Sequence, residues 1–86
     1  MSMRRGPLEI RFDIIKALQS EDRFTWICYK TNLAPKRCKE ILNELVEKGL
    51  VAIEMGRDKR NYQRFILTSQ GIMLLSLWLK MNNIIF

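Results

Sequence analysis

The stretch TWICYKTNLAPKRCKEILNELVEK, residues 25–48, decides the fold. It predicts two helices, over residues 25–31 and 35–48. Thr25 is the expected N-cap of the first helix, and Pro35 suits the first position of the second, where its missing N–H would have no partner. Asn32 falls where the chain must reverse, and Asn tolerates the left-handed backbone conformation that a sharp reversal requires. The stretch therefore predicts two short helices joined by a tight turn.

The apolar residues of this pair recur at three- and four-residue spacing. The predicted inward positions are Ile27, Cys28 and Thr31 on the first helix and Cys38, Ile41, Leu42, Leu45 and Val46 on the second. The positions left outside on the second helix are Lys36, Arg37, Lys39, Glu40, Asn43 and Glu44. A basic, polar face at the start of the second helix is typical of a helix-turn-helix that lays this face in the major groove of DNA. The alternative is an ordinary helical hairpin with a solvated charged face, which the spacing makes less favoured.

Length and composition restrict the class of protein. The 86 residues predict one small domain, residues 1–86, which is marginal alone and gains from a partner. Its net charge of +6 favours nucleic acid or an anionic surface. The chain has no histidine and two cysteines, so we expect no metal site, no cofactor and no enzymatic activity. The polar N-terminus lacks a secretory signal, so we expect a cytoplasmic, nucleoid-associated protein.

The N-terminal helix, predicted over residues 8–19, has a wider apolar arc than one packing face needs. Its apolar rows are Leu8, Phe12 and Ile15, and Ile10, Ile14 and Leu18. We therefore expect this helix to be covered on two sides. Arg4 and Arg5 precede it, and a solvated tail and a contact in the minor groove are equally favoured for them.

A β-hairpin is predicted after Gly49, which suits a left-handed helix stop. Its strands cover residues 50–55 and 62–67, with a turn over residues 56–61. Leu50, Phe65 and Leu67 are expected to pack it against the helices. Its tip and flank carry Arg57, Lys59, Arg60 and Arg64. This is the chemistry of a wing that lies along the phosphate backbone, and the alternative is a solubilising loop.

Helix, helix-turn-helix and hairpin, in this order, resemble the winged-helix proteins of archaea. The stretches that carry the resemblance are TWICYKTNLAPKRCKEILNELVEKGLV and YQRFILTSQG, and it covers nearly all of residues 8–75. In that family a Thr opens the second helix, a Tyr follows, an Asn-Leu pair makes the turn, and Leu-Thr-x-x-Gly follows the wing. The matching positions here are Thr25, Tyr29, Asn32, Leu33, Leu67, Thr68 and Gly71.

The sequence is most similar to two archaeal groups, the small basic DNA-binding proteins that dimerise through a C-terminal helix and the one-domain transcription regulators. This resemblance implies an α+β winged helix-turn-helix of three helices and a two-stranded wing, residues 7–67, followed by a dimerisation helix, residues 68–86. It also implies a homodimer that binds double-stranded DNA. The abundant chromatin-type members carry a long, charged heptad helix, which this chain lacks, and this departure argues against bulk DNA packaging.

The C-terminal stretch SQGIMLLSLWLKMNNIIF, with Thr68 as its expected N-cap, is apolar on every side of a helix and carries Lys80 as its one charge. One small monomer cannot cover all of it, and the run is too short for a membrane span. We therefore expect this helix to pair with its two-fold mate, under the spare face of the N-terminal helix. The expected interface residues are Ile10, Ile14, Ile72, Leu75, Trp78 and Leu79. A peripheral membrane anchor is the less favoured alternative, because such helices keep a strongly charged face.

The cysteines and the aromatic residues each have two interpretations. Cys28 and Cys38 are expected to be small buried side chains, and the alternative is a disulfide that locks the two helices together. Trp26 is expected to have a structural role, whereas Tyr29 could equally bond a phosphate.

The sequence thus predicts a homodimeric transcription regulator that binds duplex DNA sequence-specifically, with no membrane partner. Its expected DNA-binding residues are Tyr29, Lys36, Arg37, Lys39, Asn43, Arg57, Lys59, Arg60 and Arg64. The alternatives are a DNA-binding protein of the chromatin type without sequence preference and a winged-helix module for protein–protein contacts.

Overall fold

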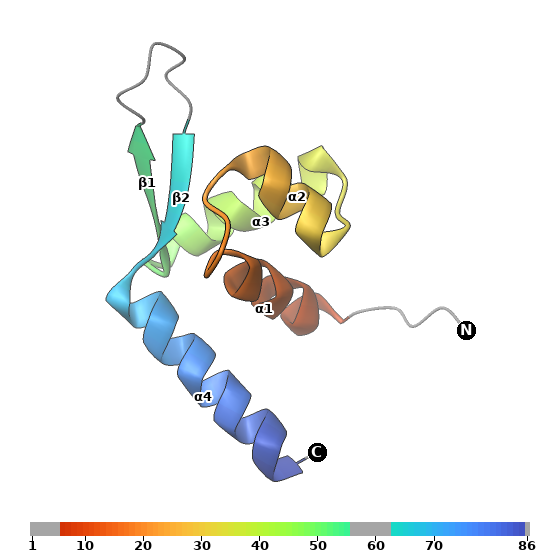
Figure 1. Cartoon of the computed structure of the whole chain (residues 1–86), viewed down its shortest axis with the longest axis vertical. Coiled ribbons are helices and arrows are strands. Elements are labelled where there is room, and N and C mark those ends of the chain that lie inside the picture. Colours follow the sequence, from red (N-terminus) through yellow and green to blue (C-terminus); the bar gives the residue numbers. More distant parts are fainter. Residues whose placement is uncertain (1–5, 56–62, 86) are drawn as a thin grey trace, which may run out of the picture.

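The computed structural model describes residues 6–55 and 63–85, and for residues 82, 84 and 85 the backbone alone. The elements in order are α1 (Pro7–Ala17), α2 (Phe24–Thr31), α3 (Pro35–Glu47), β1 (Val51–Met55), β2 (Gln63–Leu67) and α4 (Ser69–Ile85). Helices α1, α2 and α3 pack together, the β-hairpin lies to one side, and α4 extends away from the group (Figure 1). This is the winged-helix fold that the sequence predicts.

The turn between α2 and α3 forms as expected. Asn32 has φ 57° and ψ 42°, the left-handed conformation, and Pro35 occupies the start of α3. Thr25, however, is not the N-cap of α2, because the helix begins at Phe24 behind Arg23. The reason lies in the sheet. Arg23 forms an isolated bridge with Arg64 of β2, and the adjacent Phe65 N–H donates to the Asp22 carbonyl over 2.8 Å, so the chain stays extended up to Arg23.

The core lies between the three N-terminal helices and the hairpin. Its largest fully buried side chains are Phe65, Ile14, Ile15, Ile27, Ile41, Leu42, Leu45 and Cys38. Cys28 and Cys38 are both buried free thiols, so the structure contains no disulfide between them. Burial raises the pKa of the Cys38 thiol to about 12, and a hydrogen bond with Cys28 adds to the shift. Both cysteines therefore act as small apolar side chains in the core.

The start of α4 is fixed to the turn between α3 and β1. Thr68 caps the helix, because its Oγ1 accepts a hydrogen bond from the Gly71 N–H over 3.1 Å. The same hydroxyl donates to the Gly49 carbonyl over 2.7 Å. A Cβ atom at Gly71 would lie 2.2 Å from the carbonyl oxygen of Leu50. The Leu-Thr-x-x-Gly pattern thus provides a cap and a close approach that only glycine permits.

Helix α4 packs on α1 with one side only. The Trp78 ring stacks on Phe12, with centroids 4.1 Å apart and planes 6° from parallel, and Leu75 is buried beside them. Leu74 is partly buried against the core, whereas five large apolar side chains of α4 are exposed, namely Ile72, Met73, Leu77, Leu79 and Met81. None of the described helices is long and apolar enough to cross a membrane.

The expected dimer interface therefore needs correction. Ile14 and Leu75 lie closed in the core of the same chain, and Ile10 and Trp78 are partly buried against that core, since α1 and α4 pack on one another. Of the expected set, Ile72 and Leu79 remain exposed.

Candidate nucleic-acid interface

The polar surface of α3 divides into two flanks. With 100° between successive residues, Lys36, Lys39 and Asn43 fall on the side toward the hairpin, which we call the wing-side flank. Arg37, Glu40, Glu44 and Lys48 fall on the side toward α1, which we call the α1-side flank. Contacts agree with this division, because Lys39 reaches Gln63 of β2 whereas Glu44 reaches Arg11 of α1.

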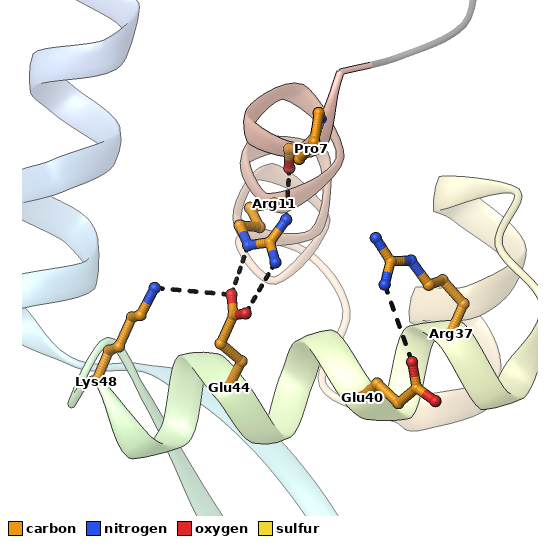
Figure 2. Close-up of polar contacts among 6 residues, drawn as sticks. All are labelled: Pro7, Arg11, Arg37, Glu40, Glu44 and Lys48. Carbon is orange, nitrogen blue, oxygen red and sulfur yellow. Dashed lines mark hydrogen bonds and ion pairs between the residues drawn. The ribbon is translucent and has the colours of Figure 1, made fainter.

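The charges of the α1-side flank are paired within the chain. Arg11 binds Glu44 through two nitrogens, with Nη2 2.8 Å from Oε1, and its Nη1 donates to the Pro7 carbonyl over 2.8 Å (Figure 2). Lys48 Nζ lies 3.8 Å from Glu44, and Arg37 lies 3.9 Å from Glu40. The hydrogen bond from Arg11 lowers the pKa of Glu44, and the same bond raises the pKa of Arg11.

Arg11 was not predicted from the sequence as a functional residue. The sequence feature that could have indicated it is a lone arginine within the apolar N-terminal helix, one helical turn after Pro7. Its function here is to hold α3 at a fixed angle to α1, because a two-point contact between guanidinium and carboxylate restricts orientation as well as distance. It also neutralises an acidic group that would otherwise repel phosphate.

The wing-side flank keeps its polar groups on the surface. Lys36 and Asn43 are exposed. Lys39 Nζ lies 5.7 Å from the centre of the Phe24 ring, and its contact with Gln63 is a long 3.5 Å. The nearest acidic residue in sequence on this side is Glu47, one turn beyond Asn43. From Lys36 to Asn43, the wing-side flank therefore carries two ammonium groups and one amide, and the carboxylate of Glu47 follows at its C-terminal end.

An open hollow of about 840 Å³ lies between α2 and the start of α3. It is lined by Phe24, Thr25, Tyr29, Asn32 and Leu33, among others. Tyr29 is 79% exposed at its edge, and Trp26 stands next to it with ring centroids 6.1 Å apart and planes 83° from parallel. Trp26 is 52% exposed, which does not support the structural role expected for it.

The basic residues expected on the wing are described in part. Arg57, Lys59 and Arg60 lie outside the described residues, as do Arg4 and Arg5 of the N-terminal arm. Arg64 is described, and its Nε donates to Asp22 over 2.8 Å. This pair ties β2 to the segment before α2, next to the bridge at Arg23. The structure therefore gives Arg64 an intramolecular contact.

Comparison with known proteins gives one family and several structural neighbours. The family model of the winged helix-turn-helix matches residues 4–86. Comparison of the sequence with curated proteins gives no match. Sso10a-2, a DNA-binding protein from Sulfolobus solfataricus, superposes with a TM-score of 0.79 at 22% identity, over 93% of this chain and 81% of that chain.

Two transcription regulators have similar structures. The regulator BldR from Sulfolobus solfataricus superposes with a TM-score of 0.77 at 20% identity, over 88% of this chain. MepR, a regulator of the Staphylococcus aureus multidrug efflux pump MepA, superposes with a TM-score of 0.78 at 16% identity, also over 88%. The chain spans 56% of BldR and 58% of MepR, so each of these proteins has a large part without a counterpart here.

Proposed function

We propose that this chain, which belongs to the winged helix-turn-helix family, is a homodimeric transcription regulator that recognises a specific sequence in duplex DNA. The observation that carries the proposal is the wing-side flank of α3, where two lysines and one asparagine lie exposed. Across the helix Arg37 and Arg11 pair with Glu40 and Glu44, so these carboxylates are partly neutralised. The wing-side flank is thereby suited to the negative potential of a DNA groove.

In the proposed complex, α3 lies in the major groove. Asn43 has the amide that pairs with the edge of adenine, and Lys36 and Lys39 are suited to guanine or to flanking phosphates. Arg37 stays in the proposed set, because its exposed pair with Glu40 is weak and can open. Tyr29 is proposed to bond a phosphate. Arg57, Lys59 and Arg60 are proposed to contact the backbone from the wing, which adds affinity but reads no sequence.

The proposed dimer forms through α4. Half of the exposed large apolar residues described in the chain lie on this helix, five of ten. A two-fold pair buries the same patch twice, so one apolar helix covers another without a second kind of surface. Leu8 of α1 is also exposed and belongs to the proposed interface with Ile72, Leu77 and Leu79. The two copies of α3 would then reach successive major grooves about 34 Å apart.

Selection from a pool of randomised duplexes tests sequence recognition. We expect one enriched site with two-fold symmetry, and binding that weakens steeply as salt rises, because released counterions drive phosphate contacts. Lys39→Glu should weaken the selected site strongly and lower the salt slope by about 0.9 per lost contact. Lys16→Glu is the matched control, since Lys16 is an exposed lysine of α1 outside the proposed surface. Equal losses for both variants on every duplex would refute sequence-specific recognition by α3.

Sedimentation equilibrium tests the dimer. Leu77→Glu places a charge within the proposed interface and should give a monomer, because a buried unpaired charge is costly. Met55→Glu adds the same charge at an exposed apolar position of β1, outside the proposed interface, and is the matched control. A wild-type chain that stays monomeric at high concentration would refute the proposed assembly.

A further inference from the structure

The aromatic residues on the outer side of α2 have no partner in the proposed duplex complex beyond one phosphate contact at Tyr29. Trp26 and Tyr29 are the two most exposed aromatic side chains described, at 52% and 79%. Large rings are normally buried, because they remove more apolar surface from water than other side chains. Two such rings next to one another on a short surface helix indicate that something covers them.

The hollow beside Tyr29 has a distinct chemistry. Its lining includes two aromatic residues, Phe24 and Tyr29. It also includes the polar residues Thr25 and Asn32, and no acidic residue. Asn32 is fixed in the left-handed conformation of the turn, so its position in the hollow is set by the backbone.

Cations lie at the rim of this hollow. Lys39 sits 5.7 Å above the Phe24 ring, and Lys36 follows directly on Pro35, which is a lining residue. Rings on which flat groups stack, with a cation within reach of each connecting phosphate, are what proteins use to bind unpaired nucleic-acid strands. A strand is favoured over a protein partner because lysines that can pair with phosphate lie near the rings and the lining of the hollow has no acidic residue.

We propose that an unpaired nucleic-acid strand binds in the hollow between α2 and α3 and extends over Trp26 beside it. Its bases stack on Tyr29 and Trp26, while Lys36 and Lys39 hold its phosphates. The edge-to-face arrangement of the two rings leaves their faces turned in different directions, so two neighbouring bases can each take one ring. Stacking does not depend on the base, because every base has a flat face, so this site has little sequence preference.

The first test uses the fluorescence of Trp26 in a Trp78→Phe background, where Trp26 is the sole tryptophan and the stack on Phe12 keeps an aromatic ring. A twelve-residue oligo-dT strand should quench this fluorescence on binding. An oligomer of the same length with abasic sugars is the control, since it has the phosphates but no bases. Equal quenching by both oligomers, or none with oligo-dT, overturns the proposal, and the second result leaves a protein as the occupant of the hollow.

The second test compares variants of Tyr29 in direct titrations with labelled oligo-dT. Tyr29→Ala should weaken binding roughly 5- to 150-fold, the range for loss of one stacked ring. Tyr29→Phe keeps the ring and should bind within about two-fold of wild type, whereas equal losses in both variants would assign the contact to the hydroxyl and overturn stacking. Met55→Ala, at an exposed apolar position of β1 that belongs to neither proposed contact surface, is the matched control. Both sites are exposed, so circular dichroism should show unchanged folding.

Duplex titrations of the same variants keep the two proposals apart. If the wild-type chain binds oligo-dT but no duplex, the stacking site is supported and the proposed regulation of transcription is refuted. If it binds duplex but not oligo-dT, the proposed regulator stands and the stacking site is refuted.

Discussion

Replacing Gly71 by alanine is expected to destabilise the protein, although Gly71 lies within α4 and alanine normally favours a helix. Helix propensity alone predicts a gain of up to about 1 kcal/mol. The structure opposes this gain, because the new Cβ atom would lie 2.2 Å from the Leu50 carbonyl oxygen, about 1.2 Å closer than ordinary contact. That oxygen belongs to the backbone and already accepts the Thr68 N–H, so it cannot rotate aside.

The magnitude follows from these two opposed effects. Overpacking typically costs about 1–3 kcal/mol, and a rigid backbone contact belongs at the upper end of this range. After the propensity gain, we expect a net loss of about 1–2 kcal/mol in the free energy of unfolding, or roughly 5–15 °C in Tm for a domain of this size. Urea and thermal denaturation at one fixed protein concentration measure it, since a dimer makes Tm concentration-dependent.

Gly49→Ala is the comparison. At Gly49 the φ angle of 76° penalises alanine, but the nearest atom is the end of the flexible Gln70 side chain at 3.3 Å. Its cost should be about 1 kcal/mol, that of a left-handed backbone alone. If Gly71→Ala raised the unfolding free energy, or cost less than Gly49→Ala, the close approach of α4 to Leu50 would be refuted.

Three further predictions concern the ion pair, the packing of α1 and the buried thiol. Arg11→Met and Glu44→Gln should show a coupling of about 1 kcal/mol or less in a double-mutant cycle, because both side chains are partly exposed. Because folding lowers the pKa of Glu44, this coupling is present above about pH 4.3, the ordinary carboxyl value, and should vanish as the pH falls through the lower pKa of the folded state. A coupling that grew in acid would contradict the pairing. Ile14→Ala should cost about 2–5 kcal/mol of stability, whereas Ile72→Ala should leave the monomer stable and weaken the dimer in sedimentation. The opposite pattern would show that Ile14 belongs to the dimer interface. The pKa of Cys38 is raised to about 12, so only about one thiol in 10⁵ is ionised at pH 7. Cys38 should therefore resist aromatic disulfide reagents until the chain is unfolded. Rapid labelling of the native protein would contradict its burial.

The sequence predicted which residues of α3 are exposed, but it did not predict which charges are paired. Helical spacing alone placed Lys36, Lys39 and Asn43 outside, and they are exposed. The partners of Glu40 and Glu44 could not be read in this way. The decisive partner, Arg11, lies 33 residues from Glu44 along the chain, and only the packing of α1 against α3 brings them together.

The sequence by itself determined the local features, the left-handed turn at Asn32, the start of α3 at Pro35 and the cap of α4 at Thr68, because each depends on backbone preferences of one or two residues. Tertiary structure decided the start of α2, which sheet pairing at Arg23 sets one residue ahead of the expected helix. It also decided which apolar residues of α1 and α4 remain available to a second molecule. Periodicity shows how many faces of a helix are apolar, but it does not show which of them the same chain covers. That depends on the angle at which two helices meet, which is set by contacts between residues far apart in sequence, such as Phe12 on Trp78.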